Sequence, residues 1–244
     1  MRRMLSFANR TMKEILRDPL TLGFGLGFPV ILLLLLSLIQ ANIPVEMFEI
    51  THLAPGITIF GLSFITLFSA QLIAKDRTSS LLTRLYTTPL KATDFILGYL
   101  LPIIPLCLAQ TVICYILAMI LGMQFSINII WATLMNLVPS FFYIALGLLC
   151  GSALTEKQVG GICGALLTNL SAWISGIWFD IQMLGKVFMR IANALPFIHA
   201  VELERAMAIG DFKAAIPHLW WVLGYGIVIM IIAIAIFLRQ MHRQ

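Results

Sequence analysis

Residues 20–40 read LTLGFGLGFPVILLLLLSLIQ, an apolar stretch without a single Asp, Glu, Lys or Arg. A helix needs about 20 apolar residues to cross a hydrocarbon core about 30 Å thick, so this stretch predicts a transmembrane helix. Five more uncharged runs follow it along the chain. They occupy residues 53–74, 95–123, 129–154, 159–179 and 217–238. The sequence therefore predicts an all-α integral membrane protein with six transmembrane helices.

The composition agrees with this interpretation. Of the 244 residues, 60% are hydrophobic and 11% are charged, and the mean hydropathy is +0.98. A chain of this length has room for several spans and little else, so we expect a single transmembrane domain over residues 1–244. The four cysteines lie inside apolar runs without metal-ligand spacing, which predicts packing residues.

Prolines predict breaks in two of the runs. The third run is longer than one span needs and contains Pro102 and Pro105, and the fourth contains Pro139. Proline removes a helical hydrogen bond and clashes with the preceding turn. We therefore expect the third and fourth helices to be kinked or partly broken.

The positions of Lys and Arg predict the orientation, because short cytoplasmic loops hold an excess of them. If the N-terminus is cytoplasmic, the cations left outside are Lys186, Arg190, Arg205 and Lys213, and all the others face the cytoplasm. The sequence thus predicts a multi-pass plasma-membrane protein with both termini inside. Topology and contact with anionic membrane lipids explain the net charge of +5, and no nucleic acid is needed as a partner.

Residues 1–19 precede the first span and have helical periodicity. The polar stretch lacks a cleavage pattern, so we expect it to be retained and not removed as a signal peptide. Its two faces predict a helix lying on the cytoplasmic membrane surface until Pro19 turns the chain inward; a frayed, solvated tail is the alternative. The apolar face would hold Met4, Leu5, Ala8, Met12, Ile15 and Leu16, and the charged face Arg3, Arg10, Lys13, Glu14 and Arg17.

The lack of charge in all six runs restricts the mechanism. Carriers coupled to protons or sodium usually place ionisable groups near the membrane midplane, so such coupling is disfavoured. No phosphate-binding Gly-x-x-x-x-Gly-Lys-Ser/Thr motif is present, since Val187 follows Gly185 and Lys186. Neither His-Glu-x-x-His nor Gly-x-Ser-x-Gly occurs, which argues against an intramembrane enzyme. Energy for uphill transport would have to come from a separate protein.

The loop after the second run is the place where such a protein would dock. Residues 75–95 read KDRTSSLLTRLYTTPLKATDF, in which Thr78 or Ser79 can cap a short helix and Pro89 can follow its end. This pattern predicts an amphipathic helix that fits a groove on a partner, although an ordinary interfacial loop helix remains possible. Its apolar face would contain Leu81, Leu82, Leu85 and Tyr86, with Arg77 and Arg84 turned away.

Four stretches resemble the type-2 family of ATP-binding-cassette (ABC) exporter permeases. They are the amphipathic start, APGI at residues 54–57, LLTRLYTTPLKATDFILGYL at 81–100, and ANALPFIHAVELERAMAIGDF at 192–212. The resemblance implies an interface helix over residues 1–19 with Arg10, Lys13 and Arg17, and a coupling-helix loop over residues 75–91. The ATPase-coupling residues would be Asp76, Arg77, Leu81, Leu82, Arg84, Leu85 and Tyr86. Family members commonly have a Glu-rich, Gly-containing stretch before the coupling helix, and here Asp76 is its nearest acidic counterpart.

The same resemblance implies partners and cofactors. Two cytoplasmic ABC ATPase subunits would bind ATP and Mg²⁺, so this chain would hold no cofactor and would not be an enzyme. A second permease copy or a homologous permease would complete a substrate path at the interface between them, with alternating access. Close helix approach at glycine pairs is expected within the subunit or at that interface. The pairs are Gly23 and Gly27, Gly147 and Gly151, and Gly160 and Gly164.

Residues 180–216 form the predicted external segment. It is too apolar for a solvated loop, so we expect two amphipathic helices near the membrane, broken at Pro196 and stopped at Gly210. His199, Glu202 and Arg205 recur at three-residue spacing. Since this region is re-entrant in the resembled family, they are candidates for lining an exit, with surface or intersubunit contacts as the alternative. A zinc site is disfavoured because no second His lies at ligand spacing.

The predicted function is export of an amphipathic drug, peptide or lipid-linked substrate out of the cytoplasm. An uncoupled channel or a secondary transporter is the alternative. Aromatic residues in the spans are candidates for lining the path, although packing or lipid contact explains such residues as well. They are Phe24, Phe28, Phe60, Phe64 and Tyr143.

Overall fold

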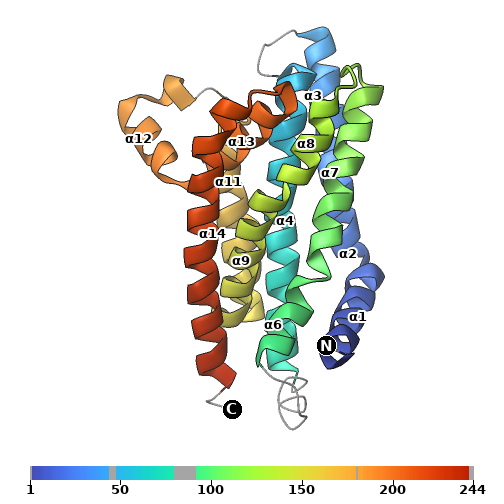
Figure 1. Cartoon of the computed structure of the whole chain (residues 1–244), viewed down its shortest axis with the longest axis vertical. Helices are drawn as coiled ribbons and strands as arrows, with labels where there is room; N and C mark the ends of the chain where they lie inside the picture. Colours follow the sequence, from blue (N-terminus) through green and yellow to red (C-terminus); the bar gives the residue numbers. More distant parts are fainter. Residues whose placement is uncertain (1, 44–47, 80–91, 180, 242–244) are drawn as a thin grey trace.

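The computed structural model describes residues 2–43, 48–79, 92–179 and 181–241, and the regular secondary structure of these residues is all helical, with no strand among them (Figure 1). The helices run side by side as one bundle. Figure 1 places helix α1 and the end of helix α14 at the same end of the bundle, which we call the α1 end. Helix α13 lies across the opposite end, which we call the α13 end.

The N-terminal region contains a surface helix and the first membrane helix. Helix α1 spans Arg2–Arg17, and α2 (Pro19–Leu22), the π-helical turn η1 (Gly23–Gly27) and α3 (Phe28–Asn42) follow it. The Asp18 carboxylate accepts hydrogen bonds from Leu20 N (3.1 Å) and Thr21 Oγ1 (2.6 Å), and Pro19 occupies the first helical position. This N-cap ends one helix and begins the next, so the predicted turn at Pro19 is confirmed.

The buried face of α1 overlaps only partly with the predicted apolar face. Ala8 and Ile15 of that face are buried, but Leu5 and Leu16 are more than half exposed, and Phe7 and Thr11 are buried in addition. The Phe7 ring packs edge-on against Phe95 and Tyr99 of helix α6, at centroid distances of 5.5 and 5.0 Å. Periodicity alone could not reveal this rotation, because it is set by contacts with α4 and α6.

Helix α4 (Ile50–Thr78) is the centre of the bundle. In the most apolar stretch of α4, 72% of the residues are buried. The buried share of the corresponding stretch is 22% in Pro19–Asn42 and 28% in α14. Helix α9 (Leu137–Ala153) packs directly on α4, because Gly151 has no side chain to keep the two helices apart. A Cβ atom there would lie 2.8 Å from the Ala70 carbonyl oxygen. The close helix approach predicted at Gly147 and Gly151 is therefore a contact within the subunit.

The prolines interrupt two helices as predicted. The third run is divided into α6 (Ala92–Leu100) and α7 (Ile103–Ile120), with Pro102 at the junction. The fourth is divided into α8 (Ile127–Met135) and α9, and Pro139 lies in the first turn of α9. A proline is tolerated at these positions because first-turn N–H groups have no helical partner.

Five helical segments are long and apolar enough to cross a membrane among the residues that the structure describes. They are Pro19–Asn42, Ile50–Thr78, Ala92–Ile120, Ile127–Ala153 and Phe212–Gln240. The sequence predicted six. The fifth predicted run forms α10 (Glu156–Val159), the π-helical η3 (Gly160–Leu167) and α11 (Thr168–Ile174). This helical stretch begins with Glu156 and Lys157 and ends at Ile174, so it is shorter and more polar than the predicted run.

The segment before the last helix has the predicted break and stop. The 3-10 turn η4 (Ile181–Leu184) leads to α12 (Lys186–Ala194), and Pro196 begins α13 (Pro196–Ile209). Gly210 has φ = 86°, a left-handed conformation that favours glycine at a helix C-terminus. Helix α14 (Phe212–Met241) completes the fold.

Candidate functional site

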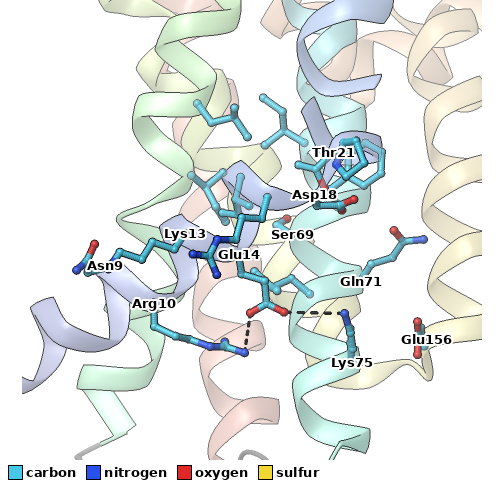
Figure 2. A pocket seen from close by; sticks show the side chains of 18 of the residues that line it. Asn9, Arg10, Lys13, Glu14, Asp18, Thr21, Ser69, Gln71, Lys75 and Glu156 are labelled. Atoms are coloured by element: carbon cyan, nitrogen blue, oxygen red, sulfur yellow. Dashed lines mark hydrogen bonds and ion pairs between the residues drawn. The ribbon is translucent and has the colours of Figure 1, made fainter. Parts of the chain in front are cut away.

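A cavity of about 770 Å³ opens between α1 and α4 at the α1 end (Figure 2). Its rim is polar, and α1 contributes most of it. Its deeper wall is apolar and comes from α4 and α7. Such a cavity suits a molecule that has both a polar and an apolar part. The rim includes Asn9, Arg10, Lys13, Glu14, Arg17 and Asp18, and the wall includes Ile65, Phe68, Leu72, Ile103 and Leu106.

Asp76 joins three helices beside this cavity. Its side chain is 3% exposed and accepts two hydrogen bonds from Arg10, Nη1 to Oδ2 at 2.6 Å and Nη2 to Oδ1 at 2.9 Å. Tyr99 Oη of α6 donates a third, at 2.8 Å. A bidentate guanidinium–carboxylate pair is among the strongest polar contacts in proteins. We call Arg10, Asp76 and Tyr99 the Asp76 clasp.

Glu14 extends the clasp toward the cavity. Its carboxylate lies 2.6 Å from Arg10 Nη2 and 4.0 Å from Lys75 Nζ, as Figure 2 shows. Partial burial acts to lower the pKa of Arg10, but the hydrogen bond with Asp76 and the charges of Asp76 and Glu14 outweigh it, so this pKa is raised. Arg10 therefore stays charged. It faces inward on α4, although the sequence placed it on the solvated face.

Lys13 and Arg17 are the other predicted interface-helix cations. Both are exposed on α1 and line the cavity rim, one helical turn apart. Among the described residues, neither has a recorded ion pair or side-chain hydrogen bond. Two cations therefore face the cavity opening and are available to an anionic group.

Arg77 turns to α9. Its Nη1 donates to the carbonyl oxygens of Gly151 (2.7 Å), Ser152 (2.5 Å) and Leu154 (3.2 Å). The last carbonyls of a helix have no helical partner, so this contact satisfies them. Asp76 and Arg77, predicted to face an ATPase, thus both make contacts within the subunit. The other coupling candidates, Leu81, Leu82, Arg84, Leu85 and Tyr86, lie outside the described residues.

An aromatic stripe runs from the cavity along α4. Phe68 lines the cavity, and the centroid of its ring lies 6.5 Å from that of Phe24. The ring centroids of Phe28 and Phe64 are 5.0 Å apart. Phe60 then contacts Phe64 at 5.4 Å and Trp178 at 5.6 Å. We call Phe24, Phe28, Phe60, Phe64, Phe68 and Trp178 the aromatic stripe; all but Phe60 are at least partly exposed. Tyr143, also predicted as path-lining, is instead fully buried and bonded to Ser171 Oγ at 2.7 Å.

Arg205 fastens α13 to the rest of the bundle at the α13 end. Its guanidinium bonds to the His52 carbonyl of α4 (3.3 Å) and to the Gly176 carbonyl after α11 (3.2 Å). It also forms an ion pair with Glu202 at 2.9 Å. Arg205 and Glu202 therefore make structural contacts in this conformation.

His199 lies beside a second histidine that the sequence analysis did not connect to it. Its Nδ1 is 2.8 Å from Nδ1 of His218, which lies in the second turn of α14. A zinc site was disfavoured because no second His lies at ligand spacing in the sequence, but the fold brings His218 beside His199. Even so, no group of three His, Cys, Asp or Glu side chains with metal-binding geometry occurs among the described residues.

Glu204 is a buried carboxyl that the sequence analysis also missed. It is 0% exposed and accepts a hydrogen bond from Tyr115 Oη of α7 at 2.8 Å. The Asn136 side chain lies close to this carboxyl, but neither Glu204 Oε2 nor Asn136 Nδ2 has a partner of good geometry among the described residues. Burial raises the pKa of Glu204 to about 8, so this carboxyl is mostly protonated near neutral pH. The spacing of Glu204 from Arg205 gave no indication of burial, because neighbouring helical positions point in different directions.

Comparison with known proteins identifies relatives of this chain. The model of the family described as ABC-2 type transporter matches residues 3–208. Two similar proteins are the capsule polysaccharide export inner-membrane proteins CtrC of Neisseria meningitidis. The protein of serogroup A is 24% identical over 156 residues, which cover 64% of this chain and 59% of the relative. That of serogroup B is 27% identical over 159 residues, covering 64% and 60%. The matched region thus spans less than two thirds of the length of these relatives.

Proposed function

Because this chain belongs to the ABC-2 type transporter family, we propose that it is the membrane permease of an ATP-driven exporter and that a separate ABC ATPase supplies the energy. The family domain is a membrane permease and not the ATP-hydrolysing subunit. ATP and Mg²⁺ would then bind to the ATPase. The relatives are inner-membrane proteins by name, and we propose the same location here.

The proposed topology has six crossings with both termini in the cytoplasm. Helix α1 and the end of α14 lie at the same end of the bundle (Figure 1), which requires an even number of crossings. The five apolar segments and the stretch from α10 to α11 together supply six. The excess of Lys and Arg at the α1 end supports a cytoplasmic location for that end. The α13 end would then face outward.

The Asp76 clasp supports a mechanism that couples the ATPase to the cavity. Residues 80–91 connect α4 to α6, and the clasp holds the end of α4 (Asp76), α6 (Tyr99) and α1 (Arg10) together. A force that the ATPase applies to residues 80–91 would therefore move α1 as well. Since α1 forms the rim of the cavity, ATP binding would change access to the cavity.

The cavity and the aromatic stripe support an amphipathic, saccharide-bearing cargo. The polar rim with Lys13 and Arg17 suits an anionic head group, and the apolar wall suits a lipid part. Aromatic rings stack well on the C–H faces of sugars, so the stripe offers a surface along which a glycan can slide. The relatives' names include capsule polysaccharide export, which agrees with this class of cargo.

A second permease copy would cover the open side of the stripe. Phe24, Leu20 and Ile31 are 45–61% exposed on the first membrane segment, and Cβ atoms at Gly23, Gly27 and Gly160 would meet nothing within 4 Å. Small residues permit close approach of helices in a membrane. The cargo path would then lie between the two copies.

The test uses the full chain reconstituted with its ABC ATPase in inverted membrane vesicles. ATP-dependent uptake of a lipid-linked polysaccharide is compared with uptake of a hydrophobic drug and a peptide. We expect uptake of the polysaccharide, and we expect Phe64→Ala to lower it about tenfold. Phe125→Ala is the matched control, because Phe125 is 69% exposed and outside the stripe. Equal uptake by the two variants would exclude the stripe as the path.

A second pair of measurements tests the coupling. Changing Leu82 and Leu85 to Asp should abolish copurification with the ATPase and ATP-dependent uptake together. Uptake that proceeds without ATP would instead favour the uncoupled channel and contradict the exporter.

A further inference from the structure

Two histidines at the α13 end face each other through the same ring atom. His199 of α13 and His218 of α14 have their Nδ1 atoms 2.8 Å apart, and their rings are 5.0 Å apart at an interplanar angle of 36°. At that distance one nitrogen must carry a proton and the other must not. The two rings are therefore joined by a hydrogen bond, and this bond exists only while one of the two Nδ1 atoms carries a proton and the other does not.

A neighbouring carbonyl determines which ring donates. His199 Nε2 lies 2.9 Å from the carbonyl oxygen of Asn193, at the end of α12. A carbonyl only accepts, so His199 Nε2 carries the hydrogen. In the neutral ring Nδ1 of His199 is then the acceptor, and His218 must donate from Nδ1. His218 Nε2 is left with a free lone pair.

The proton count of the pair follows from this assignment. A first added proton goes to Nε2 of His218 and leaves the bond between the rings intact. A second proton can only go to Nδ1 of His199, which is the acceptor of that bond. Two N–H groups would then face each other on two cations, and the bond would be lost.

The surroundings contain few charges that oppose this repulsion. Glu202 of α13 is the carboxylate whose charge acts on His218, and it is already paired with Arg205 at 2.9 Å. Helix α12 contributes the Asn193 carbonyl, and α14 contributes the uncharged Trp221 ring, whose centroid lies 5.2 Å from that of His199 at an interplanar angle of 63°.

The pair holds a segment that is largely exposed. In α12 Ala192 is buried and Phe188 packs half-buried against the core, whereas Val187 and Ile191 are 73% and 51% exposed. The last carbonyls of α12 are bonded by His199 and by Tyr225 Oη, which donates to Ala194 O at 2.7 Å. Polar contacts with α13 and α14 therefore fix this corner together with a small amount of apolar packing.

We propose that His199 and His218 form a proton-operated latch, which holds the corner between α12 and α13 on α14 and releases it when the pair takes up a second proton. The latch itself depends only on the fold. Its consequence, that acid on the outer side loosens the outer end of an exporter, rests on the proposed function.

The first test reads the tautomers directly. Nitrogen-15 NMR of the four histidines in the full chain, in lipid nanodiscs at about pH 8, reports which ring nitrogen carries hydrogen. We expect Nε2–H for His199 and Nδ1–H for His218, assigned with His218→Gln. If both rings showed Nε2–H, the proposal would be overturned.

The second test measures release of α12. Ala192 is 0% exposed, so Ala192→Cys should react with a soluble maleimide only when α12 lifts, whereas Val187→Cys reacts at all times. The rate at Ala192→Cys is divided by the rate at Val187→Cys, so that the pH dependence of thiol chemistry cancels. The chain without either substitution gives the background labelling of the native cysteines. Between about pH 8 and pH 5 we expect this ratio to rise at least about tenfold.

Two variants separate the latch from general acid loosening. The amide introduced by His218→Gln offers both a donor and an acceptor to His199 in any protonation state, so the ratio should stay low at both pH values. His52→Gln, at an exposed position on α4, should behave like the unchanged chain. The latch would be contradicted if this ratio did not change with pH in the chain with both histidines. It would also be contradicted if the ratio rose equally in His218→Gln. No ATPase or cargo is present in either test, so failure of the proposed function leaves these results unaffected.

Discussion

The two ends of the bundle hold their peripheral helices by different physical means. At the α1 end the contacts are between full charges, with Arg10 bidentate on Asp76 at 2.6 and 2.9 Å. At the α13 end Arg205 pairs with Glu202, but two further contacts are hydrogen bonds of groups that can gain or lose a proton, namely Glu204 with Tyr115 and His199 with His218. Arg10 is 35% exposed, whereas Glu204 is fully buried.

This difference indicates what each end responds to. Arg10 stays charged because its pKa is raised, so the α1 end can transmit force over the physiological pH range. A buried carboxyl and a shared imidazole proton respond to pH instead. The comparison thus predicts a mechanical link at one end and a pH-sensitive closure at the other.

Removing Asp76 should have the largest effect on stability. Asp76→Ala leaves Arg10 and the Tyr99 hydroxyl without their shared partner. We expect the free energy of unfolding to fall by about 2–3 kcal/mol, less than the about 3–5 kcal/mol of a fully buried pair, because Arg10 keeps contact with water. Denaturant unfolding in detergent micelles measures it. Glu156→Gln, an exposed acid across the cavity, is the control, and an equal loss in both variants would remove the special role of the Asp76 clasp.

Glu204 should give the next largest effect, and one that depends on pH. Below about pH 4.5 both the folded and the unfolded chain hold this proton. As pH rises toward 8 the unfolded chain releases it while the folded chain keeps it, because the folded pKa is raised to about 8. Stability therefore falls as pH rises, by about 1–2 kcal/mol between pH 6 and pH 8. Glu204→Gln should be free of this fall, and parallel pH profiles of the two proteins would show that Glu204 is not protonated when folded.

Arg205→Lys sharpens the comparison at the α13 end. Lysine cannot reach the His52 and Gly176 carbonyls and Glu202 with one planar group. We expect a loss of about 1 kcal/mol in unfolding free energy and faster proteolysis around α13. Arg190→Lys, on the exposed face of α12, should change neither quantity. A loss in the control equal to that of Arg205→Lys would count against the anchoring of α13.

The exposed cations at the α1 end should matter least for stability. Changing Lys13 and Arg17 together to Gln should alter the unfolding free energy by less than about 0.5 kcal/mol. Uptake of an anionic cargo should still fall several-fold, since the cavity rim loses its unpaired cations. Lys157→Gln, exposed on α10, is the control. If stability fell by more than about 1 kcal/mol, these side chains would be structural, and the two ends would differ less than proposed.

Much of the fold could be predicted because it follows from local chemistry. Five of the six uncharged runs correspond to helices long enough to cross a membrane. Pro102 and Pro139 lie at the predicted breaks, and Gly210 ends α13 as predicted. The family was recognised from short motifs, and the match over residues 3–208 confirms it. The fifth run was predicted less well, because hydropathy did not reveal that its helix begins at Glu156 and ends at Ile174.

The site was only partly predictable. Arg10 and Asp76 were selected as separate candidates for two roles, and their direct contact was not foreseen. Glu204 was not among the predicted site residues, because its spacing on the helix does not reveal that its side chain enters a buried pocket beside Tyr115. His218 was not considered because it is 19 residues from His199. Pairs so far apart in sequence leave no periodic pattern to detect.

The sequence by itself determined that this chain crosses a membrane, where its helices break, which end is basic and to which family it belongs. These properties depend on the solvent preference and backbone limits of individual residues, which are read one position at a time. Only the tertiary structure decided which face of α1 is buried, that Asp76 joins α1 to α4 and α6, and that two histidines share a proton. Those outcomes depend on distances between helices, because a hydrogen bond or ion pair forms only when packing brings its two atoms within about 3 Å.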